Sequence, residues 1–232
     1  NKATGIAAVA KNTVGPNKVN VINKGTIETT SGEKTTGIYG KGANIENATG
    51  AKINIGAKGV GIYTTNDSSL ENTTLNNAGE INLEGDEAVG IVAVKAKTNQ
   101  DFVVGKITGT KNKLVGAYFK ESLAATKVKD FDISLGDNAK GLVFDGGNDF
   151  TVTSSSTNKV KIGDTTGSSR GIGIAALGVN GTVSNTDVVV GKNSLGLYVK
   201  DKKLEIQVRS GNILYYGCYK FTCFFQRAVL QI

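Results

Sequence analysis

The sequence predicts an all-β protein, a right-handed parallel β-helix (a solenoid) of about seven coils. The first observation is a phrase that recurs along the chain, a glycine followed by two apolar or aromatic residues. The second is its spacing, since from Gly37 onward the glycines lie 24 to 30 residues apart. This period is typical of a solenoid, in which each repeat is one unit stacked on the next. The phrase occurs at Gly5-Ile6-Ala7, Gly37-Ile38-Tyr39, Gly61-Ile62-Tyr63, Gly90-Ile91-Val92, Gly116-Ala117-Tyr118, Gly141-Leu142-Val143, Gly171-Ile172-Gly173 and Gly196-Leu197-Tyr198.

Four copies carry a longer version of the phrase, which gives the order of elements within a coil. A short apolar segment is followed by a glycine, four mixed residues, a second glycine and a second apolar segment. One example is Ile53-Asn54-Ile55-Gly56 leading to Gly61-Ile62-Tyr63. Alternating apolar and polar residues with branched side chains predict half-buried strands, and the glycines predict the corners between them. The other copies begin at Ile81, Ile133 and Val188.

A third, weaker apolar segment completes the predicted coil. It is seen at Ala43-Asn44-Ile45, Phe150-Thr151-Val152 and Thr182-Val183. Three strands and three corners in roughly 26 residues make one coil of a parallel β-helix. An antiparallel sandwich has similar strands and turns, but it does not predict the same phrase at the same place in every repeat. Helical repeats are disfavoured by the 31 glycines.

The alternation also predicts which side chains face the core. The residue after each glycine is expected to point inward, in a ladder formed by Ile38, Ile62, Ile91, Leu142, Ile172 and Leu197. The next residue then points outward. That position holds the candidate binding residues Tyr39, Tyr63, Tyr118 and Tyr198, with Val92, Val143 and Gly173 between them. Such a stripe can stack on sugar rings or anchor a protein. The alternative is that tyrosine merely suits a strand surface.

The repeat pattern predicts two regions, a solenoid over residues 1–209 and an atypical tail over residues 210–232. The tail holds both cysteines, Cys218 and Cys223, and six of the fifteen aromatic residues. A capping coil, a strand leading to a membrane barrel, and truncated or out-of-frame sequence are all compatible with its composition. The chain contains no methionine, so we expect an internal or processed piece of a longer protein.

The net charge of +7 does not predict a nucleic-acid partner. Residues 192–232 hold seven basic and two acidic residues, and only Arg170 among the three arginines lies before them. Nucleic-acid surfaces use clustered lysine and arginine, usually with stacking aromatics. Because the other lysines are interspersed with acidic residues and glycines, we expect them to be solvated surface residues.

The sequence predicts no enzymatic activity, no metal site and no cofactor. With no histidine in the chain, the serine–histidine and cysteine–histidine catalytic arrangements are excluded. Two features nevertheless fit a carbohydrate-active β-helix enzyme, a polysaccharide lyase or glycosidase, which is the alternative function. Asp130 and Asp132 would share one face of a strand at a spacing near that of glycosidase carboxylates. Asn185-Thr186-Asp187 is similar to the first motif of polygalacturonase-like glycosidases.

Several phrases resemble the passenger repeats of large fusobacterial-type autotransporter adhesins, which use type V secretion. They are Asn23-Lys24-Gly25-Thr26-Ile27-Glu28, Thr35-Thr36-Gly37-Ile38-Tyr39-Gly40-Lys41-Gly42, Ile45-Glu46-Asn47-Ala48-Thr49-Gly50 and Gly59-Val60-Gly61-Ile62-Tyr63.

This resemblance covers roughly residues 5–208. It implies an extracellular passenger fragment displayed at the outer membrane, acting in virulence as an adhesin or stalk that attaches to host or other bacterial cells. The expected partner is a surface receptor, either protein or glycan, and membrane contact is expected only through a barrel domain outside this sequence. A spacer that binds nothing is the milder alternative.

Overall fold

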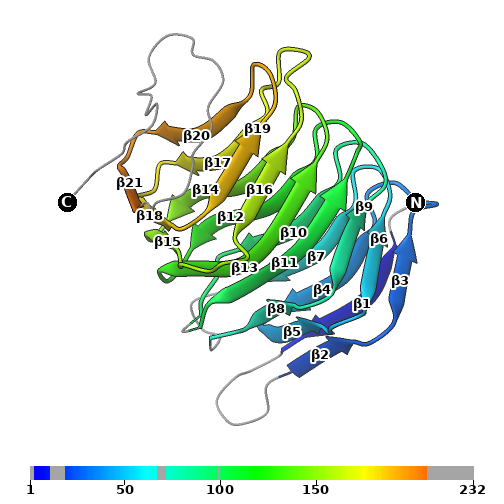
Figure 1. The fold of residues 1–232 in the computed structure, drawn as a ribbon. Helices are drawn as coiled ribbons and strands as arrows, with labels where there is room; N and C mark the ends of the chain where they lie inside the picture. The colour runs from blue at the N-terminus through cyan, green and yellow to red at the C-terminus, as the bar shows by residue number, and fades with distance from the viewer. Residues whose placement is uncertain (1–2, 11–18, 67–71, 99, 208–232) are drawn as a thin grey trace.

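The computed structural model describes residues 3–10, 19–66, 72–98 and 100–207. In these residues the chain is all-β, with 21 strands and no helix. The strands are parallel and stack as a β-solenoid of about seven turns, which confirms the predicted fold class. Figure 1 shows the strands stacked along one axis, with β1 near one end of the stack and β20 near the other.

Each coil contributes one strand to face A, the most regular of the three faces. Its eight strands pair in the order in which they occur in the coils. They are β1 (Thr4–Val9), β4 (Thr36–Lys41), β7 (Val60–Thr65), β10 (Val89–Val94), β12 (Val115–Ser122), β14 (Lys140–Gly147), β17 (Ile172–Leu177) and β20 (Leu195–Lys200).

The next two strands of each coil form faces B and C. Face B corresponds to the third, weaker apolar segment of the sequence, and face C corresponds to the first apolar segment of the long phrase. Face B contains β2 (Val19–Asn23), β5 (Ala43–Asn47), β8 (Leu75–Asn77), β15 (Phe150–Val152), β18 (Gly181–Ser184) and β21 (Leu204–Gln207). Face C contains β3 (Thr26–Thr29), β6 (Lys52–Ile55), β9 (Glu80–Leu83), β16 (Lys159–Ile162) and β19 (Asp187–Val190). The longer strands β11 (Phe102–Gly109) and β13 (Thr126–Leu135) run through both faces.

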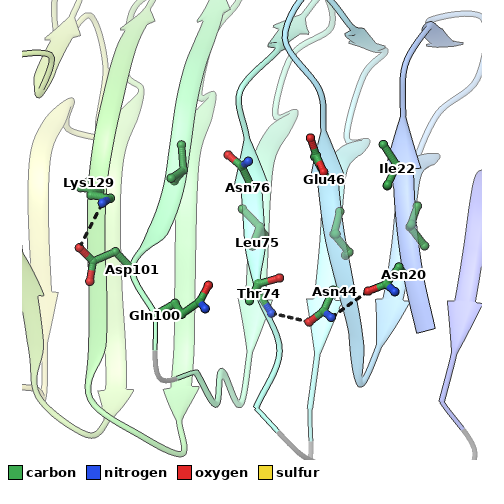
Figure 2. Close-up of a pocket in the computed structure, with 13 residues that line it drawn as sticks. Asn20, Ile22, Asn44, Glu46, Thr74, Leu75, Asn76, Gln100, Asp101 and Lys129 are labelled. Carbon is green, nitrogen blue, oxygen red and sulfur yellow. Dashed lines mark hydrogen bonds and ion pairs between the residues drawn. The ribbon is translucent and has the colours of Figure 1, made fainter. Parts of the chain in front are cut away.

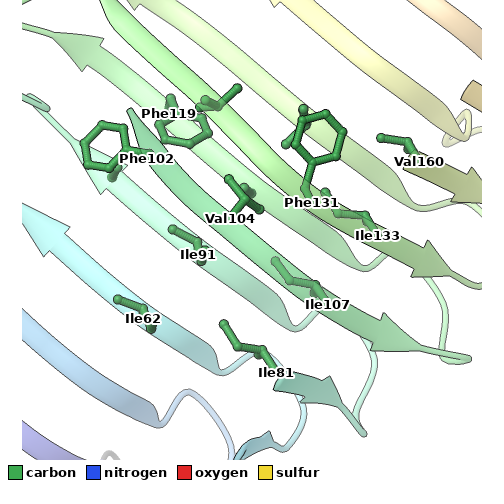
Figure 3. Packing of buried hydrophobic residues seen from close by; sticks show 14 of the residues in the cluster. Ile62, Ile81, Ile91, Phe102, Val104, Ile107, Phe119, Phe131, Ile133 and Val160 are labelled. Atoms are coloured by element: carbon green, nitrogen blue, oxygen red, sulfur yellow. The ribbon is translucent and has the colours of Figure 1, made fainter. Parts of the chain in front are cut away.

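The core consists of ladders of identical or similar side chains. Ile38, Ile62 and Ile91 are fully buried and lie opposite one another on face A. The same ladder continues through Ala117 and Leu142. A second ladder on face C contains Ile81, Ile107, Ile133 and Val160, and Figure 3 shows the two ladders facing each other across the interior. The predicted inward positions are therefore confirmed in these coils.

The ladder prediction is wrong in the seventh coil. Ile174, not Ile172, lies between Leu142 and Leu197, and Ile172 pairs with Lys140 and Leu195 at the outer surface. The segment from Gly171 contains two overlapping glycine phrases that differ by two residues. Gly173, and not Gly171, takes the inward position that Gly141 and Gly196 have in the neighbouring coils, so Ile172 before it faces outward and Ile174 after it faces inward. Both glycines fit the repeat phrase, so the sequence alone could not distinguish the two registers.

Aromatic side chains fill the middle of the core. Phe102 packs against Phe119 with ring centroids 5.7 Å apart, and Phe119 stacks on Phe144 at 5.1 Å. Phe144 in turn stacks on Phe150, and all four rings are buried. They come from faces A and B of successive coils, so these rings join the two faces through the interior.

A row of buried amides lies at the corner between faces B and C. Asn23 donates a hydrogen bond to Asn47 at 2.8 Å, and Asn47 donates to Asn77 at 2.7 Å. The Asn77 amide donates to the backbone carbonyl of Val104 at 2.8 Å, and the three asparagines are almost fully buried. In the next coil the corner is Gly105, whose φ of +67° places it in the left-handed region. The amide ladder thus links four successive coils.

The glycines of the repeat phrase have two different roles. Gly56 and Gly136 lie where a strand of face C ends and a turn begins, as predicted. Gly61 and Gly90 instead lie inside strands of face A. A Cβ atom on Gly90 would be 2.5 Å from the Gly116 carbonyl oxygen and 2.9 Å from the Ile107 side chain. These inner glycines therefore allow close approach of the backbone.

Replacing Gly90 by alanine is expected to lower the free energy of unfolding by about 1–3 kcal/mol, because the added methyl group overlaps backbone atoms of the next coil. The matched control is Gly25→Ala, since a Cβ there would meet no atom within 4 Å. Chemical unfolding followed by circular dichroism measures the free energy of unfolding of both variants. Equal losses in the two variants would contradict the close-approach explanation.

The predicted tail, residues 210–232, lies entirely outside the described residues. Residues 208–232 are not described, so Cys218, Cys223 and the boundary predicted after residue 209 have no structural test. Among the residues that the structure describes, no helix is long and apolar enough to cross a membrane.

Candidate functional site

The four candidate tyrosines lie in one outward-facing row on face A. The strand pairing places Ala7, Tyr39, Tyr63, Val92 and Tyr118 opposite one another in successive coils, in that order. It continues through Val143 and Ala175 to Tyr198. Ala175 stands where Gly173 was expected, because of the same two-residue shift as in the core ladder.

The structure brings two of the tyrosines together and separates the others. The rings of Tyr39 and Tyr63 stack with centroids 5.7 Å apart at an angle of 24°. Tyr118 lies between Val92 and Val143, and its hydroxyl donates a hydrogen bond to Asp145. Burial of the ring, followed by this hydrogen bond, raises the pKa of the Tyr118 phenol above its ordinary value. Tyr198 is separated from Tyr118 by two smaller side chains.

Rows beside the tyrosines extend the apolar surface. One row contains Val60, Val89 and Val115, then Lys140, then Ile172 and Leu195, all half-buried on the outer side of the sheet. The row on the other side contains Val94 and Leu177 among charged residues. We call the outer surface formed by the tyrosine row and the row that begins with Val60 (the valine row) the apolar face. The valine row was missed at the sequence level, although an apolar residue directly before the glycine in several of the phrases gives the signal.

Face C, by contrast, is charged and compensated. Its outer row alternates in sign from coil to coil, because the registers place opposite charges next to each other. Lys106 lies 2.8 Å from Glu80, and the hydrogen bond and charge of Glu80 raise the pKa of the lysine. The row consists of Lys52, Glu80, Lys106, Asp132, Lys159 and Asp187. Such a surface contributes no excess positive charge, which fits the expectation that these lysines are solvated surface residues.

The two residue sets considered for glycoside chemistry do not form an acid–base pair. Asp130 lies at the bend of β13 with a φ of +51°, and it accepts a hydrogen bond from Ser155 at 2.6 Å. Asp132 lies beyond that bend, in the charged row of face C. The prediction that the two share one strand face is therefore wrong, because the chain turns a corner between them.

The Asn185-Thr186-Asp187 motif is also divided by a corner. The Asn185 amide donates to the hydroxyl of Ser154, and Asp187 lies opposite Lys159 in the charged row. Across residues 3–10, 19–66, 72–98 and 100–207, no three histidine, cysteine, aspartate or glutamate side chains gather where they could hold a metal ion.

The apolar face is thus the feature of the solenoid that best fits a binding role. Its strands are fully paired along the stack, so recognition would use side chains and not free strand edges. Its tyrosines and the valine row are half-buried, whereas Val92, Val143 and Ala175 between the tyrosines are buried. A partly exposed apolar and aromatic surface is typical of interaction sites. Comparison of the chain with protein families, with curated proteins and with solved structures gave no match.

Proposed function

We propose that this chain is a segment of a surface-displayed autotransporter passenger, a non-enzymatic stalk that attaches to host or other bacterial cells. The apolar face carries this proposal. One side of the solenoid presents aligned tyrosine, valine, isoleucine and leucine over several coils, whereas face C presents a compensated charged surface. A spacer that binds nothing has no need for this difference between its faces.

A protein surface is the partner that suits the apolar face. Valine, isoleucine and leucine have no groups to hydrogen-bond sugar hydroxyls. Tyr39 and Tyr63 stack on each other, so one face of each ring is occupied. Desolvation of aliphatic area together with tyrosine anchors is characteristic of protein–protein contacts. We therefore assign the receptor to the protein class.

The experiment combines Tyr63→Ser and Tyr118→Ser in the full 232-residue chain, displayed on bacteria through a heterologous outer-membrane anchor. We expect a fall of at least roughly tenfold in adhesion strength to receptor-bearing cells, because tyrosine anchors contribute about 2 kcal/mol or more each. Circular dichroism and melting confirm that the fold is intact. Tyr63→Phe should retain adhesion, since the apolar area remains.

The matched control is Val189→Ser, which removes an exposed apolar side chain from face C. It should leave adhesion unchanged. If the double tyrosine variant also adheres normally, the apolar face has no binding role and the spacer alternative is favoured.

A further inference from the structure

A second feature lies on face B, where an open groove crosses the first five strands of that face. It has a volume of about 670 Å³ and is lined from β2, β5, β8, β11 and β13. Figure 2 shows its side chains in two outward rows that run across the strands. One row contains Asn20, Asn44 and Thr74, followed by Gln100 and Asp101 just before β11. The other contains Ile22, Glu46, Asn76, Val103 and Lys129.

Some of the groove's polar groups are held in place by neighbours. The Asn44 amide donates to the Asn20 side chain at 2.9 Å, and the Thr74 backbone N–H donates to Asn44 at 3.0 Å. Lys129 lies 3.8 Å from the Asp101 carboxylate. These contacts fix amide and carboxylate groups at the intervals of the strands, about 4.8 Å apart.

Other polar groups in the groove retain hydrogen-bonding capacity. The side chains of Glu46, Asn76 and Gln100 make no hydrogen bond or ion pair with any other residue that the structure describes. Glu46 and Asn76 are half-buried and line the groove. Amides offer donors as well as acceptors, and a carboxylate offers acceptors. The groove therefore presents aligned hydrogen-bond donors and acceptors, which suit a ligand that carries many hydroxyl groups.

The shape and charge of the groove narrow the choice of ligand. The backbone groups of these strands are used in the sheet, so a peptide cannot add to it as a further strand. Asp101 is compensated by Lys129, which leaves the Glu46 carboxylate as an unpaired charge within the lining and disfavours anionic ligands. Ile22, which is 51% exposed, and Val103 add small apolar contacts.

We propose that this groove binds a linear, uncharged glycan chain lying along the axis of the solenoid. Five strands at about 4.8 Å spacing give roughly 19 Å of length, enough for several linked sugars. Their hydroxyls would bond to Asn76, Gln100 and Glu46, while Ile22 and Val103 contact the apolar faces of the rings. The site lies on a different face from the tyrosine row and does not depend on the proposed adhesion through that row.

The test is calorimetric titration of the full chain with defined hexasaccharides. Cellohexaose and chitohexaose are the uncharged probes, hexagalacturonate is the anionic probe, and an (Ala-Thr)₄ peptide represents an extended polypeptide. We expect an uncharged probe to bind and hexagalacturonate to bind at least about tenfold more weakly because of Glu46. The combination of Asn76→Ala and Gln100→Ala should weaken glycan binding about tenfold or more, since two hydrogen bonds are lost.

The matched control is Thr182→Ala, on the same outer face but beyond the groove. It should leave binding unchanged. The melting temperature of the Asn76 and Gln100 variants should equal that of the parent chain, because these side chains have no partner among the described residues. Binding of the peptide alone, failure of both uncharged probes, or glycan affinity unchanged in the double variant would each overturn the proposal.

Discussion

Replacing Ile91 by aspartate is expected to unfold the central coils. Ile91 is fully buried and lies between Ile62 and Ala117 in the inward ladder of face A. An unpaired carboxylate in this position costs about 3–5 kcal/mol after relaxation. In a solenoid each coil is stabilised mainly by its two neighbours, so a defect in the fourth coil weakens two interfaces. Chemical unfolding followed by circular dichroism should show a large loss of stability.

The control for this prediction is Val189→Asp. Val189 is 41% exposed on face C, so the same charge remains hydrated and stability should change by no more than about 0.5 kcal/mol. Ile91→Val, which removes one methylene group, should cost about 0.5–1.5 kcal/mol. A stable Ile91→Asp protein would contradict the inward register of face A.

Replacing Asn47 by leucine is expected to have the second largest effect. The Asn47 side chain accepts a hydrogen bond from Asn23 and donates one to Asn77, within a fully buried row. Leucine has a similar size, but it leaves the side-chain oxygen of Asn77 without the hydrogen-bond donor of Asn47. It also removes the side-chain oxygen that accepts a hydrogen bond from the Asn23 amide. Each unpaired buried polar group costs about 1–3 kcal/mol, so we expect a loss of about 2–4 kcal/mol.

The structure offers a matched control for the amide ladder in the same coil. Asn54 also lies within a side-chain ladder, since it donates to Glu28 at 2.7 Å and accepts from Asn82 at 2.9 Å. This ladder is on the outer side of face C, where water replaces lost bonds. Asn54→Leu should therefore cost less than about 1 kcal/mol. Equal losses at the two positions would show that burial does not decide the strength of the ladder.

The sequence phrase determines which row the candidate tyrosines occupy, and the tertiary structure determines which residues surround them. The tyrosines share a row because the phrase places them directly after an inward residue, and this is visible in the sequence. Their surroundings are not visible there. The stacking of Tyr39 on Tyr63 and the contact of Tyr118 with Asp145 depend on which coils are neighbours. The groove on face B likewise combines residues as distant in sequence as Asn20 and Lys129.

The sequence by itself determined the repeat, the parallel solenoid and the inward positions of Ile38, Ile62 and Ile91, because a period near 26 and an alternation of two are local patterns. Only the tertiary structure decided the register in the seventh coil, where Ile174 replaced Ile172, and the separation of Asp130 from Asp132 by a corner. It also decided the apolar face, the charged row and the groove. The physical reason is that turns of varying length set which outward residues meet across coils, and alternation along one strand carries no information about that pairing.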